Sequence, residues 1–416
     1  MTSWRWWLSW ASTPLWGAAL VLAWTAFSFW TGSVLADEFS RLRQAGVPLS
    51  TALKAPDDSS PVGDDFARAL AMITDPPLGM GFDRGSRFPY CWDEAAELRE
   101  RAASWVARNR VGLDLLVRTL DGRAPRLLAT STKDPQALIP SFRMASRPVP
   151  LLACAARLAG EEGRWDEVER LLVMIFSILD AFRDTSLPHF WILASVGLRR
   201  ALDLVESFAN AGGTFGAPLR RAVEVVGTRS FRASCAARLD LERAFAFELL
   251  EGPVTGLTPD PVPLVDRILV WNPLLRPHLR LREVRYSKYI DSLKATCLSQ
   301  TWHPVFELDD AGLRADLEAV LTTLVMPNWR DIETAAQDDA RAALLGAALK
   351  ALDAKGAGKD WPLDLSARHF SHDPLTRDAF RMRREGSRLI LYSVGTDMTD
   401  HGGDPNKDVV ITLVAR

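Results

Sequence analysis

Four aspartates crowd into the segment TDMTDHGGDPNKD near the C-terminus: Asp397, Asp400, Asp404 and Asp408. Calcium takes six to eight oxygen ligands, and closely spaced carboxylates together with backbone carbonyls supply them. Four carboxylates in one loop repel one another and destabilise it unless a cation or water screens them. The spacing therefore admits a calcium site, in which Asp397 and Asp404 would be the leading ligands and Asp400 and Asp408 the second pair.

An alternative interpretation of the same loop needs no ion. Gly402 and Gly403 let the backbone turn sharply, and aspartate and glycine are ordinary turn-forming residues. A solvated acidic turn thus stays open beside the calcium site.

The histidines predict no second metal centre. His369 and His372 have a spacing that could hold a metal on a helix, but Pro374 opposes a helix there, so a surface loop is expected. The other histidines have no evident partner in the sequence: His189, His278, His303 and His401.

Sequence signatures of enzymes are missing as well. The chain contains no GxSxG, HExxH or strand-bound GxGxxG, and KGAGKD lacks the Walker spacing and the following Ser or Thr. We expect a non-catalytic protein, with a hydrolase whose residues lie far apart in the sequence as an alternative.

The four cysteines are widely spaced and form no CxxC pair: Cys91, Cys154, Cys235 and Cys297. A zinc ribbon or a redox motif therefore has no support. Because free cysteine is among the most buried residue types, buried thiols are expected. An oxidising compartment would permit disulfides, but the spacing predicts no pairing.

Composition indicates a folded protein without affinity for nucleic acid. The 416 residues are 48% hydrophobic and 25% charged, enough to bury a core in two or three domains. The formal net charge is −2, from 50 basic and 52 acidic residues, so no electrostatic footprint for nucleic acid exists.

The N-terminal segment predicts a membrane anchor. No charged residue occurs between Arg5 and Asp37, and the most apolar part runs from Leu15 to Ala36. These 22 residues, at about 1.5 Å each, span the roughly 30 Å hydrocarbon core of a bilayer. Tryptophans lie before the segment and at Trp30, as in interfacial belts.

Cleavage and orientation each have competing interpretations. SVLA before Asp37 resembles a signal-peptide cleavage site, but the long apolar run favours an uncleaved anchor. The short N-terminal tail and large C-terminal body suit a signal anchor that exports the body. The side after the apolar segment is no poorer in Lys and Arg than the side before it, so a cytoplasmic body remains an alternative. We expect a single-pass membrane protein with an extracytoplasmic body.

The body is predicted to be α-helical. APDDSSPVGDD, residues 55–65, indicates a linker after a juxtamembrane helix at about 38–54. Apolar residues then recur at helical spacing, most clearly in residues 150–182, where two helices joined by GEEGRWD form an αα-hairpin. A third helix is expected at 187–210.

The hairpin resembles a tetratricopeptide repeat, but its period does not recur faithfully elsewhere. A repeat-like helical array and an irregular bundle both remain open. The expected organisation is an anchor at 1–36, a juxtamembrane helix and linker at 37–65, a helical body at 66–327 and a C-terminal module at 328–416.

The C-terminal module is predicted to be a small antiparallel β meander after a long helix at 332–354. AFRMRRE and RLILYSV are typical of strands, and Gly386 supplies the turn between them. DVVITLV, after the aspartate-rich loop, is expected to be the last strand.

This module resembles the C-terminal region of the major pseudopilin of type II secretion. Asp373-Pro374 matches the start of that family's pattern, Ser393-Val394-Gly395-Thr396-Asp397 matches its Ser-Leu-Gly-Ala-Asp run, and Gly402-Gly403 matches its glycine pair. Phe380 takes an aromatic position. The chain departs from the family in its N-terminal residues, in the roughly 300 residues before the module, and in a loop one residue longer. Membrane-anchored helical proteins of bacteria with a similar ending also occur.

The resemblance implies that the aspartate-rich loop binds calcium. Together these observations predict a membrane-anchored helical protein of the bacterial envelope that binds another protein through its helical body. A component of a type II secretion or pilus-like apparatus is the alternative.

Overall fold

The computed structural model confirms a mainly helical chain with one small C-terminal antiparallel sheet. It describes residues 4–48, 61–77, 96–121, 144–183, 188–228, 230–251, 274, 276–299, 301–302, 329–356, 361 and 372–414. The helices are α1 (Trp4–Gln44), α2 (Pro61–Met72), α3 (Ala96–Arg108), α4 (Arg110–Leu120), α6 (Pro148–Glu161), α7 (Trp165–Arg183), α8 (Pro188–Asn210), α9 (Ala217–Thr228), α10 (Phe231–Glu251), α12 (Arg276–Cys297) and α15 (Trp329–Gly356). The strands are β1 (Arg381–Glu385), β2 (Arg388–Ser393) and β3 (Val409–Val414).

The chain divides into two compact units. Unit 1 comprises Met1–Thr51, Leu239–Ser292 and Asp310–Met326, and unit 2 comprises Ala52–Arg238, Leu293–Asp309 and Pro327–Arg416. Segments far apart in the sequence thus fold together. The range 66–327, expected above as one helical body, is divided between the two units, whereas the module expected at 328–416 lies within unit 2.

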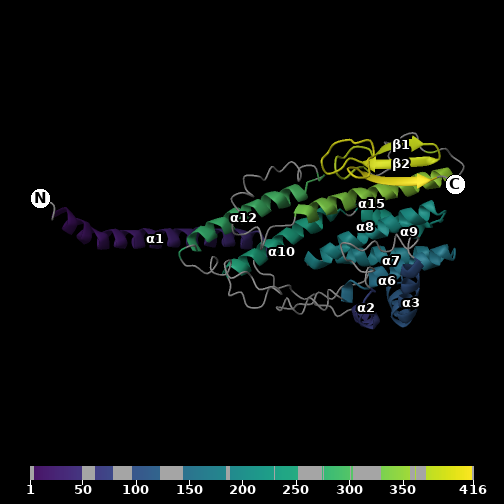
Figure 1. Cartoon of the computed structure of the whole chain (residues 1–416), viewed down its shortest axis with the longest axis horizontal. Coiled ribbons are helices and arrows are strands. Elements are labelled where there is room, and N and C mark those ends of the chain that lie inside the picture. The colour runs from purple at the N-terminus through teal and green to yellow at the C-terminus, as the bar shows by residue number, and fades with distance from the viewer. Residues whose placement is uncertain are drawn as a thin grey trace. The chain divides into compact units, whose positions relative to one another are not determined.

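Unit 1 holds the N-terminal helix. Because α1 continues through Ala36 to Gln44, the helix expected from about residue 38 is not separate from the anchor helix, and residues 49–54 of its expected range lie outside the described residues. The helix ends where Gly46 adopts a positive φ of 71° and the Val47 N–H bonds back to the Leu42 carbonyl. Figure 1 shows the N-terminal part of α1 extending beyond the start of α12, its neighbour in this unit.

One face of α1 becomes buried only in its second half. Residues 18–23 are exposed, with Leu20 and Leu22 each 70% accessible. From Trp24 onward, partly or fully buried positions recur at helical spacing, ending in Leu35 and Leu42. The second half of α1 is thus a packed helix, while the apolar stretch just before it has no covering side chains among the described residues.

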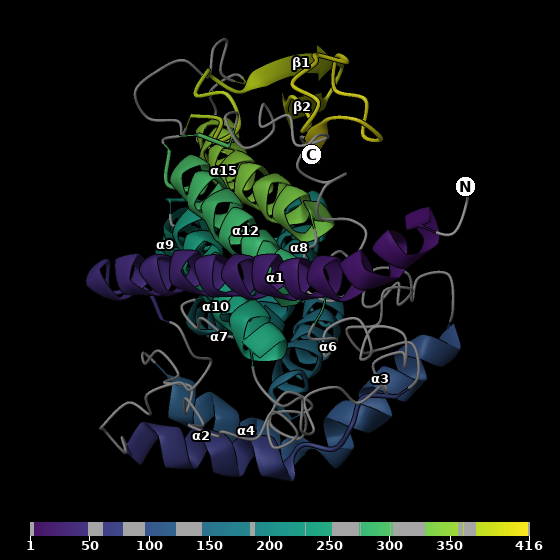
Figure 2. The ribbon, with the colours of Figure 1, turned by 90° about the vertical axis from the view of Figure 1, so that its left-hand side faces the viewer.

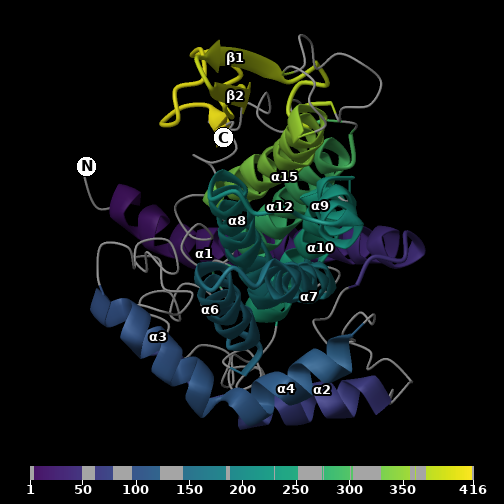
Figure 3. The same cartoon turned by 90° about the vertical axis from the view of Figure 1, so that its right-hand side faces the viewer.

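Unit 2 begins with two packed helix pairs. α2 lies beside α4 (Figure 2), and α2 starts at Pro61, inside the stretch expected to be a linker. The predicted αα-hairpin is formed by α6 and α7, followed by α8 at almost the expected bounds (Figure 3).

The turn of the α6–α7 hairpin requires glycine at Gly163, which has a φ of 70°. The Arg164 N–H bonds to the Ala159 carbonyl at 2.9 Å, closing α6 with a Schellman motif. On the second helix, the predicted apolar stripe from Val168 to Phe182 is buried.

The helix α15 is the centre of the C-terminal half of unit 2. It packs against α8 and α9 on one side and against β2 and β3 on the other (Figure 1). Small side chains make this close packing possible, because eight of its alanines are at most 3% exposed: Ala335, Ala336, Ala340, Ala342, Ala343, Ala347, Ala348 and Ala351.

The sheet is the predicted meander, with strand order β1-β2-β3 and antiparallel pairing throughout. Gly386, with a φ of 59°, makes the first turn, and Arg388↔Val414 and Ser393↔Val409 fix the register of β2 against β3. Side chains of α8 form hydrogen bonds with backbone groups on the outer edge of β3. Asn210 donates to the Thr412 carbonyl at 2.8 Å and accepts from the Val414 N–H at 3.1 Å, while Glu206 accepts the Thr412 N–H at 2.9 Å. These contacts protect a strand edge that would otherwise expose unpaired backbone groups.

Candidate functional site

The residues that carried the resemblance meet at the base of the aspartate-rich loop. Ser393, at the end of β2, donates from Oγ to Asp373 Oδ2 at 2.6 Å, and Asp373 also accepts the Leu375 N–H at 2.9 Å. Burial raises the pKa of Asp373, and the Ser393 hydrogen bond opposes that shift. Thr396 Oγ1 donates to Glu333 of α15 at 2.7 Å. Both contacts anchor the start of the loop.

Close backbone packing shapes the rest of the loop. A Cβ added at Gly395 would lie 2.0 Å from the Lys407 carbonyl oxygen, so no larger residue fits there. Gly402 and Gly403 both have positive φ, 71° and 81°, as turns of this tightness require.

Asp397 and His401 form a pair that the sequence analysis missed. His401 Nε2 lies 2.9 Å from Asp397 Oδ2, and the Thr399 N–H donates to Asp397 Oδ1 at 3.1 Å. These contacts, the His401 bond above all, lower the pKa of Asp397. The separation of four positions could have suggested the pair, but that rule applies to helices and this segment is a loop.

Asp400 and Asp404 also have local partners. Asp400 accepts the Gly402 N–H at 2.8 Å and lies 3.2 Å from Arg381 Nε. Asp404 accepts the backbone and side-chain N–H groups of Asn406 at 3.0 and 3.1 Å, and the backbone bond lowers the pKa of this carboxyl.

Asp408 differs from the other three aspartates. It is 6% exposed, and its Oδ2 accepts the N–H groups of Gly403 and Asp404 at 2.7 and 3.2 Å. Its Oδ1 is buried and has no hydrogen-bond partner among the described residues. A buried carboxylate oxygen without a partner is costly and suits a cation.

The fit of the loop to calcium is therefore partial. Carboxylates and turned backbone are the right donor types. Within the described ranges, however, no three His, Cys, Asp or Glu side chains converge so as to hold a metal. Asp408 fits a cation best, because one of its carboxylate oxygens is buried without a partner. Asp397 and Asp404, the leading ligands predicted from the sequence, instead form hydrogen bonds with His401 and Asn406.

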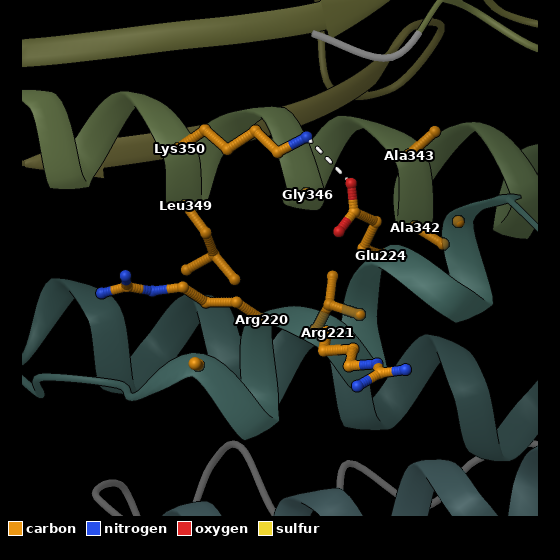
Figure 4. Close-up of a pocket in the computed structure, with 11 residues that line it drawn as sticks. Arg220, Arg221, Glu224, Ala342, Ala343, Gly346, Leu349 and Lys350 are labelled. Carbon is orange, nitrogen blue, oxygen red and sulfur yellow. Dashed lines mark hydrogen bonds and ion pairs between the residues drawn. The ribbon is translucent and has the colours of Figure 1, made fainter. Parts of the chain in front are cut away.

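A groove of about 440 Å³ lies between α9 and α15. Its floor consists of small residues, including Gly227 and Gly346, and Figure 4 shows three basic side chains around it. Lys350 Nζ lies 3.1 Å from Glu224, and Arg220, on the rim, lies 2.6 Å from Asp353. The groove combines a narrow apolar floor with a charged rim, which suits a side chain or segment of another protein rather than a metal ion.

A second cavity, of about 330 Å³, lies at the start of α10. Arg183, Ser230, Arg232, Ser234 and Cys297 contribute to its wall. Arg232 donates from Nε to Ser230 Oγ at 3.0 Å, and burial lowers its pKa. The described linings of this cavity and of the groove contain no histidine.

Asp339 of α15 is buried beside this cavity and ties three segments together. It accepts the Phe231 N–H at 2.9 and 3.0 Å, the Trp302 Nε1–H at 2.9 Å and the Ser230 hydroxyl. Burial raises its pKa to about 6 against these hydrogen bonds. The carboxylate lies at the start of α10, where the helix leaves backbone N–H groups unpaired.

The cysteines follow the expectation where the structure describes them. Cys154, Cys235 and Cys297 are buried thiols that form no disulfide with one another, and Cys91 lies outside the described residues. Cys235 and Cys297, which the sequence did not pair, have their sulfurs 3.7 Å apart.

Among the histidines, His372 is exposed in a loop, as expected, and His369 and His303 lie outside the described residues. His278 contacts the Phe27 ring at 5.2 Å between centroids, within unit 1.

Compared with known proteins, the chain matches no family model, no curated protein and no solved structure. A function must therefore be inferred from the geometry and the sequence alone.

Proposed function

We propose that this protein is a single-pass membrane protein of the bacterial envelope whose helical body binds another protein. The observation that carries the first part is α1. Its stretch Ala18–Gln44 is long and apolar enough, by length and composition, to belong to a membrane-crossing helix. The second half of α1 is packed into unit 1, and the residues just before it are exposed: Leu20, Val21 and Leu22. A continuous helix of this kind would hold the body directly at the bilayer.

The inner membrane and an extracytoplasmic body are part of the same proposal. A short N-terminal tail before the apolar segment and a large body after it are typical of a signal anchor. The test is a pair of C-terminal fusions in a Gram-negative bacterium, one to alkaline phosphatase and one to a fluorescent protein that matures only in the cytoplasm. Phosphatase activity without fluorescence supports export. The reverse pattern would place the body in the cytoplasm, and a carbonate-soluble protein would contradict the anchor itself.

The protein-binding part of the proposal rests on the groove between α9 and α15. Its floor admits a narrow segment, because an added Cβ at Gly346 would meet nothing within 4 Å. Its rim carries Arg220, Arg221 and Lys350 against Glu224. Arg220 lies 2.6 Å from Asp353 and Lys350 lies 3.1 Å from Glu224, so the rim carries one basic group in excess. Small floor residues and this excess suit an acidic segment of a partner protein.

The experiment fills the groove. Gly346→Trp adds bulk where the structure leaves open space, so the fold should be retained. Val225→Trp is the matched control, since Val225 is 39% exposed on α9 and does not line the groove. Cross-linking in membranes followed by purification should recover a partner with the native and Val225→Trp chains and lose it with Gly346→Trp. Equal recovery with both variants would remove the groove as the binding site.

A second candidate, a role in a type II secretion or pilus-like apparatus, is favoured by the C-terminal module. The 28-residue α15 precedes a meander whose β2–β3 connection holds the aspartates, the order that the resemblance implies. In this role the loop binds calcium, with Asp408 Oδ1 as the oxygen best placed to receive the ion, and the ion would stabilise the loop. A deletion strain that secretes its exoproteins normally would argue against this candidate.

A further inference from the structure

The basic face of α12 lies beside the second half of α1 within unit 1. His278 contacts Phe27 at 5.2 Å between ring centroids and Trp24 at 6.2 Å. Arg280 Nη1 donates to the Ser28 carbonyl at 3.3 Å. Further along, Ser287 contacts Glu38 at 2.5 Å, and Asp291 contacts Arg41 at 2.5 Å. The contacts advance in the same order on both helices, so α1 and α12 run in the same direction.

This arrangement limits how far the bilayer extends along α1. Arg280 lies level with Ser28, and its guanidinium is 3.3 Å from a Cβ added at Gly32. A charged guanidinium in hydrocarbon is unfavourable by several kcal/mol at the bilayer centre. The hydrocarbon must therefore end near Trp24, although the apolar run in the sequence continues to Ala36.

The remaining length of α1 matches a bilayer. From Trp4 to Ala23 the backbone is continuously helical. At about 1.5 Å per residue this part spans roughly 30 Å, the thickness of the hydrocarbon core. Arg5 then lies at the far interface, and Trp24 and Trp30 lie at the near one, as interfacial tryptophans do.

Basic residues follow directly on the body side of this boundary. His278, Arg285 and Lys288 are exposed on α12, and Arg282 is partly exposed between them. Measured along the helix from His278, Arg282 is about 6 Å, Arg285 about 10 Å and Lys288 about 15 Å further from the hydrocarbon. A headgroup layer is roughly 5–8 Å thick on each side, so His278 would lie within it, Arg282 at its outer edge, and Arg285 and Lys288 beyond it.

We propose that this basic face of α12, formed by His278, Arg282, Arg285 and Lys288, attracts anionic phospholipids at the base of the anchor. His278 and Arg282 bind the phosphate groups, and Arg285 and Lys288 act on them at longer range. The proposal rests on the membrane anchoring proposed above. The electrostatic attraction to the lipid falls off within a Debye length of about 8–10 Å, so it is strongest at the His278 end of α12 and weakest at Lys288. This difference along the helix orients unit 1 against the bilayer surface.

The first arm of the test measures lipid preference. The full-length protein in neutral detergent is mixed with vesicles of phosphatidylcholine, or with vesicles that also contain phosphatidylglycerol, and its distribution is measured at low salt. The native protein should prefer the anionic vesicles. Arg282→Gln should reduce that preference about fivefold, and Lys288→Gln less, because each basic residue near the surface contributes about that factor.

Arg108→Gln is the matched control, because Arg108 is exposed on α3 of unit 2 and its loss changes the net charge equally. Circular dichroism checks that each variant is folded. If Arg108→Gln lowers the preference as much as Arg282→Gln, the effect is one of net charge and the proposal fails. Equal binding to both kinds of vesicle also overturns it and leaves the anchor intact. Failure to bind either kind would contradict the anchor instead.

The second arm measures depth. Single cysteines introduced at Val21, Phe29 and Ser33 are treated in vesicles with a membrane-impermeant maleimide, and labelling at each site is read by peptide mass. Phe29→Cys and Ser33→Cys should be labelled and Val21→Cys protected. Protection of all three would place the bilayer over residues 15–36, bring Arg280 into hydrocarbon and refute the assignment of α12 to the headgroup layer.

Discussion

Replacing the buried carboxyl of Asp339 with an amide should change how the stability of the protein depends on pH. Asp339 is 3% exposed, and burial raises the pKa of its carboxyl to about 6 in the folded protein from an ordinary 3.8. Between these values the folded chain holds a proton that the unfolded chain has released. The free energy of unfolding contributed by this group is therefore fully present below about pH 4 and declines as pH rises through 6.

The size of this decline follows from the shift. A difference of about 2 pKa units corresponds to about 3 kcal/mol, and no discount for solvent screening applies because the group is buried. Asp339→Asn removes the titration. It also leaves fewer acceptor lone pairs for the Ser230, Phe231 and Trp302 donors, which costs about 1–3 kcal/mol at every pH if one donor loses its partner.

The two effects have opposite signs at neutral pH. Asp339→Asn should be less stable than the native protein near pH 4 and about equally stable, or more stable, near pH 7.5. Urea unfolding of the full-length chain in a mild detergent, followed by tryptophan fluorescence between pH 4 and 8, measures both curves. Asp203, whose pKa burial also raises to about 6, contributes equally to the two proteins and cancels in their difference.

Asp166→Asn is the control, since Asp166 is exposed on α7. Its curve should run parallel to that of the native protein. A constant difference between Asp339→Asn and the native protein across the whole range would refute the reasoning, because Asp339 would then be ionised in the folded chain at all of these pH values.

Four other changes test separate parts of the structure. Asn210→Ala should lower the free energy of unfolding by about 1–3 kcal/mol, because the edge of β3 loses a donor and an acceptor; hydrogen exchange of the β3 amides is the readout. Arg243→Met should cost about 3 kcal/mol, since a fully buried guanidinium lies 2.5 Å from each of two carboxylates that would lose their cation; the urea midpoint measures it. Calcium at a hundredfold excess over its dissociation constant should stabilise the native chain by about 2.7 kcal/mol and Asp408→Asn much less, and identical melts with calcium and with a chelator would contradict binding. In an oxidising compartment a thiol–disulfide oxidant should join Cys235 to Cys297, lowering the mass of the isolated protein by two hydrogens, a change absent in Cys235→Ser.

Local patterns were sufficient where a residue's neighbours in the fold are also its neighbours in the sequence. Periodicity predicted α6, α7 and α8 within a few residues, and alternation with Gly386 predicted the meander. A separate helix was expected after Ala36, but α1 continues, because Glu38 is hydrogen-bonded to Arg41 and Ser287 and can be buried. The roles of Asp339 and Asp408 could not be predicted. The partners of Asp339 include Ser230, which lies 109 positions away, and the orphaned oxygen of Asp408 depends on the three-dimensional course of its loop.

The polar contacts near the C-terminal end of α1 explain how this helix keeps one position in unit 1. Glu38 is 6% exposed, and its carboxylate accepts hydrogen bonds from Arg41 Nη2 at 2.6 Å and from the Ser287 hydroxyl at 2.5 Å. The hydrogen bond from Arg41 is the main reason that the pKa of Glu38 is lowered. Leu35 and Leu42 alone would tolerate a slip of one helical turn, because one apolar side chain can replace another in such a contact. A slip of one turn carries Glu38 and Arg41 together about 5.4 Å along α12. It keeps the Glu38–Arg41 pair but breaks the Ser287–Glu38 hydrogen bond and the Arg41–Asp291 ion pair. These two contacts between the helices thus favour the observed register of α1 against α12. In the arrangement proposed above, the same register would set the level of the basic face of α12 relative to the bilayer.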